Sequence, residues 1–415
     1  MTTVDEPPGD RADSAGGPHR HTPPSDEFAA AYGESLRDVL DVESWHTGED
    51  LGAMYERIAS EVAGAVGQER RIHGRIRERV FAHLEAHPPI PGAGLYRATL
   101  DQVRRAHEGL LMTGAVEACD ATRHAHETLP LTVVQIGVSL VSYNRNLGTW
   151  AQRLFRRDLR ESLPDPAEEA LALLERRSAG SERMDASRLL QRAIMTYAER
   201  AILLKRGQAA WRMGHGNPAA QELLSGAAGS IDLVIESTRL LEELICRHKK
   251  FVFVPSDPTD RALLTIGDAL QPLEFAIVRP LTDQIAPFLA NADYDLRTAS
   301  DTTTPDGRRL SPREWMVRFR DQIAGQVAVG VYRASEVAPA RLFYAHVDHA
   351  HEAALIAIAD SLLQPHRGFP MLIDVAHHVC AATLGPDTLA GPIQAAYTRA
   401  GVPLRYLGER MTRGR

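Results

Sequence analysis

The sequence predicts a mixed α/β fold, and three observations support this prediction. Between residues 115 and 159, segments rich in β-branched and aromatic residues follow one another with little between them. A long amphipathic pattern at residues 185–207 then predicts a helix. Beyond it, short apolar runs of strand length alternate with helical patterns. Consecutive strands followed by strand–helix–strand alternation are typical of a mixed sheet flanked by helices.

The N-terminal part of the chain has a different composition. Pro, Gly, Asp and Ser dominate residues 1–25. This composition predicts a disordered tail, for which we set the boundary at residue 30. Residues 31–110 are predicted as an N-terminal helical region, and the long helix within it ends before Pro88 and Pro89. Apolar residues recur there at helical spacing at Leu51, Met54, Ile58, Val62, Val66, Ile72, Ile76, Val80 and Leu84. This spacing predicts a long amphipathic helix, with Gly67 and Gly74 as candidate breaks.

The first strands of the predicted core form an antiparallel meander. Ala115–Asp120 is a short apolar run, and Val133–Tyr143 is rich in β-branched residues. Thr149–Leu159 alternates apolar and polar residues, and Asn144–Gly148 supplies the turn before it. The helix at Asp185–Gly207 follows, after a charged stretch at residues 160–184 that is predicted to be loosely helical.

The remaining elements alternate between strand and helix. The predicted strands are Asp232–Ile235, Phe251–Val254, Val327–Tyr332 and Ala340–Tyr344. A helix is predicted after Ile235 and another at Ile373–Ala382, and residues 293–312 are predicted to be a polar excursion. The order of a meander, a helix and then a strand–helix–strand alternation is that of the RNase H-like fold. We therefore predict one RNase H-like domain at residues 111–415, with a mixed sheet flanked by helices.

Composition limits the function classes. The 415 residues carry a net charge of −7 and include only three cysteines, at irregular spacing, which argues against a disulfide framework or a cysteine zinc site. The sequence contains no apolar run of about 18 residues, which predicts no membrane span and a cytoplasmic protein. It also lacks a Walker A phosphate-binding loop and an HExxH metalloprotease motif.

Acidic residues at the ends of the predicted core elements suggest a metal-dependent phosphodiesterase. Asp120 and Glu236 each end a predicted strand, and neighbouring first and fourth strands would bring them together. Glu199 lies in the helix at 185–207, and His377 lies in the last helix with Asp374 one turn earlier. Hydrolysis of phosphodiesters by two metal ions needs carboxylates converging on one point, and oxygen ligands favour Mg²⁺ or Mn²⁺.

Several of these segments resemble motifs of the NurA family of nucleases. Gly368–His377 resembles the family's C-terminal signature of an aromatic-Pro pair followed by an Ala-His pair, and Cys119–Thr122 resembles its first Asp-Gly-Ser motif. Glu199 lies where the family has an acidic helix, and Ile235–Ser237 resembles its second strand-ending acidic motif. The resemblance spans roughly residues 110–400 and implies an RNase H-like core and Mn²⁺-dependent DNA cleavage. It also implies homodimers that work beside a HerA-type hexameric ATPase.

The chain departs from the family pattern in three places. Ala121 replaces the usual Gly, and Glu236 replaces the usual Asp. Phe253–Ser256 stands where the family often carries a lysine.

The sequence therefore predicts a divalent-metal-dependent DNA nuclease acting in end processing, repair or phage defence. Asp120, Glu199, Glu236 and His377 are the predicted catalytic and metal-binding residues, and Asp374 is a further candidate ligand. One alternative is a docking or DNA-binding subunit of a translocase complex that no longer cuts. The other is a metallohydrolase built around the histidines of residues 346–351.

Three further clusters have weaker interpretations. His124, His126 and Glu127 are predicted to form a polar loop after Asp120. Two arginine clusters are candidate contacts to a phosphate backbone. They comprise Arg70, Arg71, Arg75, Arg77 and Arg79, and Arg153, Arg156, Arg157 and Arg160.

Overall fold

The computed structural model describes residues 25–45, 51–127, 131–156, 174, 182–225, 231–291, 302–304 and 307–404. Two compact units make up the chain, Met1–Arg70 and Arg71–Arg415. The predicted tail at residues 1–30 falls mostly outside the described residues, as do most of residues 160–184 and 293–301. None of the described helices has the length and apolar composition needed to cross a bilayer.

The smaller unit is helical. It contains α1 (Ser25–Tyr32), α2 (Leu36–Leu40), the short 3-10 turn η1 (Val42–Ser44) and most of α3 (Leu51–Arg75). The helical path continues without a break through η3 (Ile76–Phe81) and α4 (Ala82–Ala86). Gly67 and Gly74 both lie inside α3, so neither breaks the helix, and η3 is a π-helical segment instead.

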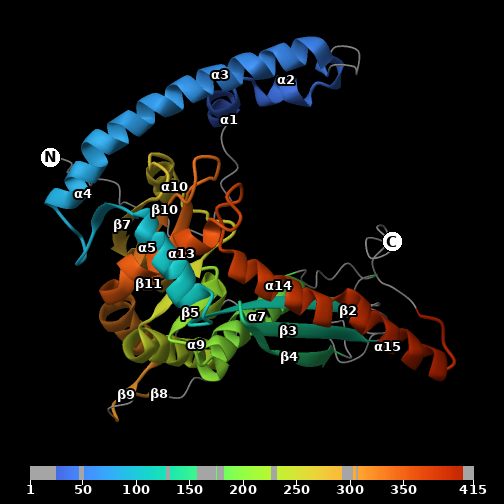
Figure 1. Cartoon of the computed structure of the whole chain (residues 1–415). Coiled ribbons are helices and arrows are strands. Elements are labelled where there is room, and N and C mark those ends of the chain that lie inside the picture. The colour runs from blue at the N-terminus through green and yellow to red at the C-terminus, as the bar shows by residue number, and fades with distance from the viewer. Residues whose placement is uncertain are drawn as a thin grey trace, which may run out of the picture. The chain divides into compact units, whose positions relative to one another are not determined.

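The larger unit is built on one nine-stranded mixed sheet (Figure 1). Its strands are β1 (Gly94–Arg97), β2 (Val116–Glu127), β3 (Thr132–Ser142), β4 (Arg145–Arg156), β5 (Trp211–His215), β6 (Phe251–Val254), β7 (Glu274–Pro280), β10 (Val327–Tyr332) and β11 (Arg341–His346). Their order across the sheet is β1-β7-β10-β11-β6-β5-β2-β3-β4. A separate two-stranded ribbon pairs β8 (Thr302–Thr303) with β9 (Arg309–Leu310).

Strand order and direction identify an RNase H-like core. β2, β3 and β4 form an antiparallel meander, and β5 and β6 extend it as parallel strands on the far side of β2. The remaining four strands continue the sheet antiparallel from β6. The predicted mixed α/β fold with an RNase H-like core is therefore confirmed.

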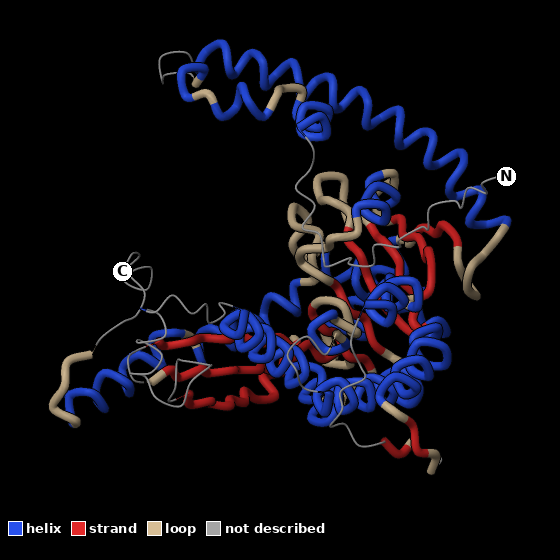
Figure 2. The backbone as a smooth tube through the Cα atoms, turned by 180° about the vertical axis from the view of Figure 1, so that it is seen from behind, coloured by secondary structure: helices blue, strands red, loops and turns tan. Residues whose placement is uncertain are grey.

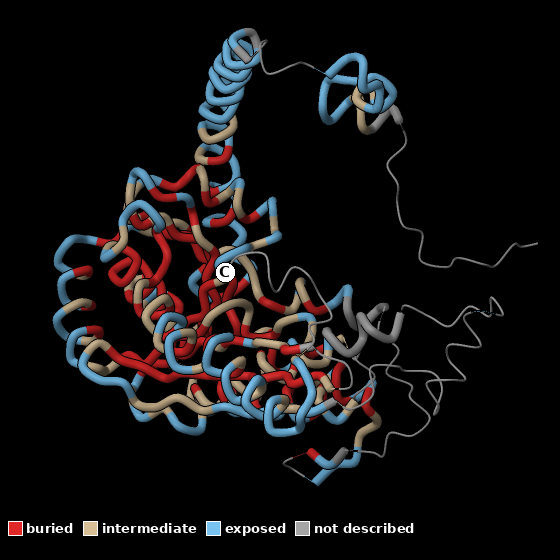
Figure 3. The backbone as a smooth tube through the Cα atoms, turned by 90° about the vertical axis from the view of Figure 1, so that its right-hand side faces the viewer, coloured by how far each residue is buried: buried red, intermediate tan, exposed pale blue. Residues whose placement is uncertain are grey.

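Helices cover both faces of the sheet. The remaining helical segments are α5 (Leu100–Ala106), η4 (His107–Leu111), α7 (Glu182–Arg206), α8 (Gln221–Leu224), α9 (Ile231–Glu242), η5 (Glu243–His248), α10 (Arg261–Asp268), α11 (Thr282–Asn291), α12 (Pro312–Arg318), η6 (Phe319–Ile323), η7 (Ala324–Gln326), η8 (Val347–His349), α13 (Ala350–Ser361), α14 (Met371–Leu384) and α15 (Pro386–Arg399). One core cluster joins the sheet to α7–α12, and the other joins it to α5, α13 and α14. The strands thus lie between helical layers (Figure 2), and the buried residues concentrate in the interior of the larger unit (Figure 3).

The meander is confirmed, but two of its boundaries differ from prediction. β2 does not end at Asp120; it continues to Glu127, because antiparallel pairing with β3 extends to Glu127 opposite Thr132. His124 and His126 are therefore strand residues, and the predicted polar loop at this position is wrong. β4 begins earlier than predicted, at Arg145, so the turn from β3 is shorter than Asn144–Gly148.

The predicted strand at Asp232–Ile235 is wrong. These residues belong to α9, whose buried side includes Val234, Ile235, Leu240 and Leu241 at helical spacing. A run of three apolar residues does not distinguish a strand from a buried helix face. The fourth core strand is β5, which is next to β2 as the fold requires.

Part of the predicted N-terminal helical region lies in the larger unit. Residues 71–110 belong to the larger unit. Strand β1 pairs with the edge strand β7, and Arg77 binds Glu274 of β7 with a nitrogen–oxygen distance of 2.7 Å. Predicted strands at Phe251–Val254 and Val327–Tyr332 match β6 and β10, and the predicted last helix lies within α14.

Candidate active site

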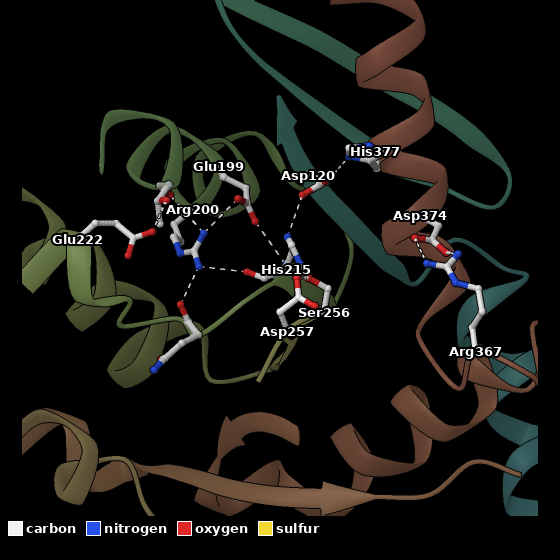
Figure 4. Close-up of polar contacts among 12 residues, drawn as sticks. Asp120, Glu199, Arg200, His215, Glu222, Ser256, Asp257, Arg367, Asp374 and His377 are labelled. Carbon is white, nitrogen blue, oxygen red and sulfur yellow. Dashed lines mark hydrogen bonds and ion pairs between the residues drawn. The ribbon is translucent and has the colours of Figure 1, made fainter. Parts of the chain in front are cut away.

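Asp120 is the centre of a buried polar group at the end of the parallel part of the sheet. Parallel pairing of β2 with β5 ends at Cys119 opposite Gly214, so Asp120 and His215 come next on adjacent strands. The Asp120 carboxylate contacts two imidazoles, one through each oxygen (Figure 4). Oδ1 lies 3.3 Å from Nδ1 of His215, and Oδ2 lies 2.7 Å from Nδ1 of His377 on α14.

Glu199 reaches the same place from α7. Its Oε1 accepts a hydrogen bond from the backbone N–H of His215 at 3.3 Å, and its Oε2 lies 3.1 Å from Nη1 of Arg200. Asp120 and Glu199 are only 5% and 4% exposed, so two neighbouring carboxylates are buried, and the two imidazoles and Arg200 supply the positive charge next to them. Burying carboxylates is costly unless they are paired or bind a cation.

Arg200 holds the chain that follows β5. Its guanidinium donates to the backbone carbonyls of His215 and Asn217 at 3.1 and 2.7 Å and stacks over the Phe253 ring at 5.4 Å. With an exposed side-chain fraction of 3%, it also supplies the nearest positive charge to Glu199. Arg200 therefore fixes the position of His215 and partly neutralises the buried acid.

The two histidines and Asp120 stabilise one another's charged forms. Burial alone would raise the pKa of Asp120, but hydrogen bonds from His215 and His377 outweigh it and hold the pKa below its usual range. Burial likewise lowers the pKa of His215, yet the Asp120 and Glu199 carboxylates raise it overall. For His377 the hydrogen bond to Asp120 is the main cause of a raised pKa.

Glu199 has the opposite electrostatic character. Burial raises its pKa, Arg200 opposes this, and the negative charge of Asp120 adds to the rise, which brings the pKa to about 7. The site therefore contains one carboxylate that is held ionised and one that is protonated near neutrality. Such divergence between neighbouring acids is common at functional sites.

An open cleft of about 660 Å³ adjoins Glu199 and His215. It is lined by residues of α7, of the segment after β5 and of the segment after β6, including Arg200, Asn217 and Asp257, and by Arg279 of β7. Nε2 of His215 contacts the Ser256 hydroxyl at 3.0 Å at the edge of this cleft. The buried polar group thus has a route to solvent on the side of His215.

Three of the predicted site residues meet in this group, and two do not. Asp120 and His377 are in direct contact, and Glu199 joins them through His215. Asp374 lies one turn before His377, but its carboxylate pairs with Arg367 and accepts from Nε2 of Gln364 at 2.7 Å.

Glu236 is the clearer error. It lies on the exposed side of α9 and pairs with Arg239 at 2.5 Å. Glu236 therefore does not lie at the end of the fourth core strand, and it is not part of the site. Its predicted position depended on a strand at 232–235, where the chain is helical.

Sequence reasoning missed His215 and Arg200. The strand that ends at His215 reads Trp-Arg-Met-Gly-His, and its Arg and Gly obscure the usual strand pattern. One signal was available, because a short run between the helix at 185–207 and Pro218 is where the fourth strand of the predicted fold belongs. Arg200 follows Glu199 directly, yet a helical Glu-Arg pair ordinarily indicates a solvated surface.

The histidines of residues 346–351 do not form a ligand cluster. His346 is buried and its Nδ1 accepts from the backbone N–H of Asp348 at 3.1 Å. His349 packs edge-on against Trp211, and His351 packs against Tyr96. Across the described part of the chain, no group of three or more His, Cys, Asp or Glu side chains is arranged to hold a metal ion.

The predicted arginine clusters are only partly described. Arg77 forms an ion pair with Glu274. The Nε of Arg153 donates a hydrogen bond to Oε1 of Gln135 at 2.8 Å. Arg157 and Arg160 lie outside the described residues.

Comparison with known proteins gives structural similarities only. No protein-family model matches the chain, and no curated protein matches it. The NurA nuclease from Sulfolobus solfataricus is 8% identical with a TM-score of 0.43, covering 83% of this chain and 98% of that one.

Two further solved structures are similar to the chain. A NurA structure with manganese is 8% identical with a TM-score of 0.38, covering 72% of this chain and 96% of that one. Endonuclease V from Ciona intestinalis, bound to DNA, is 10% identical with a TM-score of 0.23, covering 65% of this chain and 85% of that one. The RNase H-like assignment rests on the strand order described above.

Proposed function

We propose that the chain is a divalent-metal-dependent nuclease that cleaves DNA at the Asp120–Glu199–His215–His377 group. The observation that carries this proposal is the burial of two carboxylates together, at the end of the parallel core strands and beside an open cleft. A buried acid pair that opens onto a cleft is a place where a metal ion can take over the role of the protein's own cations.

The donor set suits Mn²⁺ or Mg²⁺. Carboxylate oxygens of Asp120 and Glu199 are ligands that both ions accept. With Glu236 elsewhere, only these two carboxylates are available for the predicted ligand set. Both oxygens of Asp120 contact imidazoles whose pKa is raised, so a metal cation would be repelled by their positive charge, and we expect at least one of His215 and His377 to swing away when a metal binds.

Each residue of the group has a distinct proposed role. Asp120 is the principal ligand and Glu199 is the second, while Arg200 keeps Glu199 and His215 in place. The bound ion would polarise the scissile phosphate and activate water. His377, which is partly exposed on α14, is placed to orient or exchange a proton with a group at the phosphate, and Asp374 with Arg367 anchors the start of that helix.

A second candidate function is a DNA-binding or docking subunit that does not cut. The observation that favours it is that protein cations already contact both carboxylates, the imidazoles at Asp120 and Arg200 at Glu199. A site neutralised in this way has less need of a metal. Metal-dependent cleavage by the isolated chain separates the two functions.

We further propose the biological setting implied by the sequence motifs. The chain would act as a homodimer with a HerA-type hexameric ATPase, in DNA end processing, repair or phage defence in the cytoplasm. The absence of a Walker A loop from the sequence is the reason for assigning ATP-driven movement to a partner.

Cleavage of labelled DNA by the purified chain tests the proposal. Wild type should cut with Mn²⁺ and stop cutting in excess chelator, and Asp120→Ala should reduce cleavage to background while its thermal transition persists. Glu236→Ala is the matched control, because that carboxylate is exposed and paired with Arg239, and it should cut like wild type. Cleavage by Asp120→Ala at the wild-type rate would show that the site is wrongly placed.

A further inference from the structure

Two arginines pack on the same aromatic ring beside His215. The guanidinium carbons of Arg341 and Arg367 lie 5.7 and 5.9 Å from the centre of the Phe369 ring, and this ring meets His215 edge-on at 6.0 Å. Phe369 is 4% exposed, so it is a fixed support. The two positive charges are therefore held at a set position next to the candidate active site.

Arg341 is anchored through backbone carbonyls. Its Nη1 donates to the Ser256 carbonyl at 3.0 Å, and its Nη2 donates to the Arg367 carbonyl at 2.8 Å. A guanidinium has five N–H groups, so each terminal nitrogen of Arg341 retains a second N–H. The hydroxyl of Ser256 contacts His215, so Ser256 links Arg341 to the candidate active site.

The charge of Arg341 is not matched by a carboxylate. Within the described residues, Arg341 makes no ion pair, whereas Arg367 is paired with Asp374. Together the two arginines and Asp374 carry one net positive charge. Arg341 is partly exposed and the Arg367 side chain is 57% exposed, so an anion can approach both.

We propose that Arg341, with Arg367, binds a backbone phosphate of the nucleic-acid substrate next to the scissile position. The inference rests on the proposed nuclease function and assigns part of its substrate contact. A planar guanidinium pre-positioned on an aromatic ring loses little side-chain freedom on binding and matches phosphate oxygens. Arg200 is unsuited to this role because its side chain is 3% exposed and occupied by backbone carbonyls.

The dependence of DNA binding on salt tests the proposal independently of cleavage. Each phosphate contact contributes roughly 0.9 to the slope of log affinity against log salt for duplex DNA. In excess chelator, with a short fluorescein-labelled duplex and anisotropy as the readout, Arg341→Gln should lower that slope by about 0.9. Arg341→Lys keeps the charge and should keep most of the slope.

Arg239→Gln provides a matched control, because Arg239 also stacks on an aromatic ring, 5.6 Å from the centre of Trp315, and pairs with Glu236 one turn earlier on α9. It should leave the slope unchanged. If Arg341→Gln fails to fold, the test is made with Arg367→Gln, whose substitution is at an exposed position. This variant should also weaken DNA binding. An unchanged slope in a folded Arg341→Gln variant overturns the inference alone, whereas no DNA binding by wild type overturns the nuclease proposal as well.

Discussion

At the residue scale, the two carboxylates of the candidate site have different surroundings and therefore different pKa values. Asp120 is surrounded by groups that donate hydrogen bonds to it, and its pKa is lowered despite burial. Glu199 has one guanidinium and one backbone N–H, which is too little to offset burial and the charge of Asp120. Asp120 is thus ready to bind a cation, and Glu199 becomes a ligand when a cation or rising pH removes its proton.

Glu199 should make metal-free stability depend on pH. Its folded pKa of about 7 lies above the ordinary value of 4.5, so folding retains a proton that the unfolded chain releases. The stabilising contribution is fully present below pH 4.5 and is lost as the pH rises through about 7. The loss is at most about 3 kcal/mol.

Glu199→Gln removes this proton equilibrium while preserving the shape of the side chain. In chelator, the melting temperature of wild type should therefore fall relative to that of Glu199→Gln between about pH 5 and pH 8. Asp360, whose pKa burial also raises to about 7, is present in both proteins and cancels in the comparison. Parallel melting curves across this pH range would contradict the electrostatic description of Glu199.

At the element scale, the position of the site depends on the register of β2 against β5. Glu117 and Arg212 face each other across these strands, three residues before Asp120 and His215. Nη1 of Arg212 lies 3.3 Å from Oε2 of Glu117, and the same oxygen accepts from the backbone N–H of Gln208 at 2.7 Å. Arg212 is 5% exposed and Glu117 is 1% exposed, so the pair is inside the protein.

Breaking this pair should be strongly destabilising. Arg212→Met leaves the Glu117 carboxylate buried without a counter-charge, which costs about 3–5 kcal/mol. Replacing both residues, Glu117→Leu with Arg212→Met, should recover much of that loss because no buried charge remains. Urea unfolding measures both variants; a single variant as stable as wild type would mean that the pair does not carry a net charge interaction.

The sequence was informative about elements in proportion to their length and periodicity. The meander, α7, β6, β10 and α14 were predictable because each has a long or strongly apolar pattern. β5 was not, because Arg212 looks incompatible with a buried strand until its partner Glu117 is known. Gly214 gives no strand signal either, yet a Cβ there would lie 2.1 Å from the Phe253 ring, so this strand requires glycine.

At the scale of the whole molecule, α3 of the smaller unit presents apolar side chains to solvent. They recur at helical spacing and are 39–64% exposed at Met54, Tyr55, Ile58, Val62 and Val66. A stripe of this kind is unusual on a monomer, and two-fold pairing is the commonest way to cover one. We therefore expect a homodimer with α3 at the interface.

Light scattering on the full chain checks the oligomeric state. Wild type should have the mass of two chains at micromolar concentration, and Ile58→Asp combined with Val62→Asp should have the mass of one chain. A monomeric wild type, or a dimer that the double variant does not disturb, would exclude this interface. In the sequence, the dimer was implied by the resemblance to the NurA family.

Predicting the site needed both the fold and the side-chain partners. Asp120, Glu199 and His377 were accessible from motif order, because each lies on an element that the sequence identified correctly. Glu236 was misplaced because α9 was taken for a strand, and His215 was missed for the complementary reason. Contacts such as Asp374 with Arg367 depend on three-dimensional neighbours that no spacing rule specifies.

The central claim is that Asp120 and Glu199 bind the catalytic metal. Anomalous diffraction from crystals soaked in Mn²⁺ locates the ion directly. We predict a Mn²⁺ peak in contact with the Asp120 carboxylate and beside Glu199, with His215 or His377 moved off Asp120, and no such peak in Asp120→Ala. Mn²⁺ bound elsewhere in wild type, or an Asp120 carboxylate still held by both imidazoles at saturating Mn²⁺, would contradict the account.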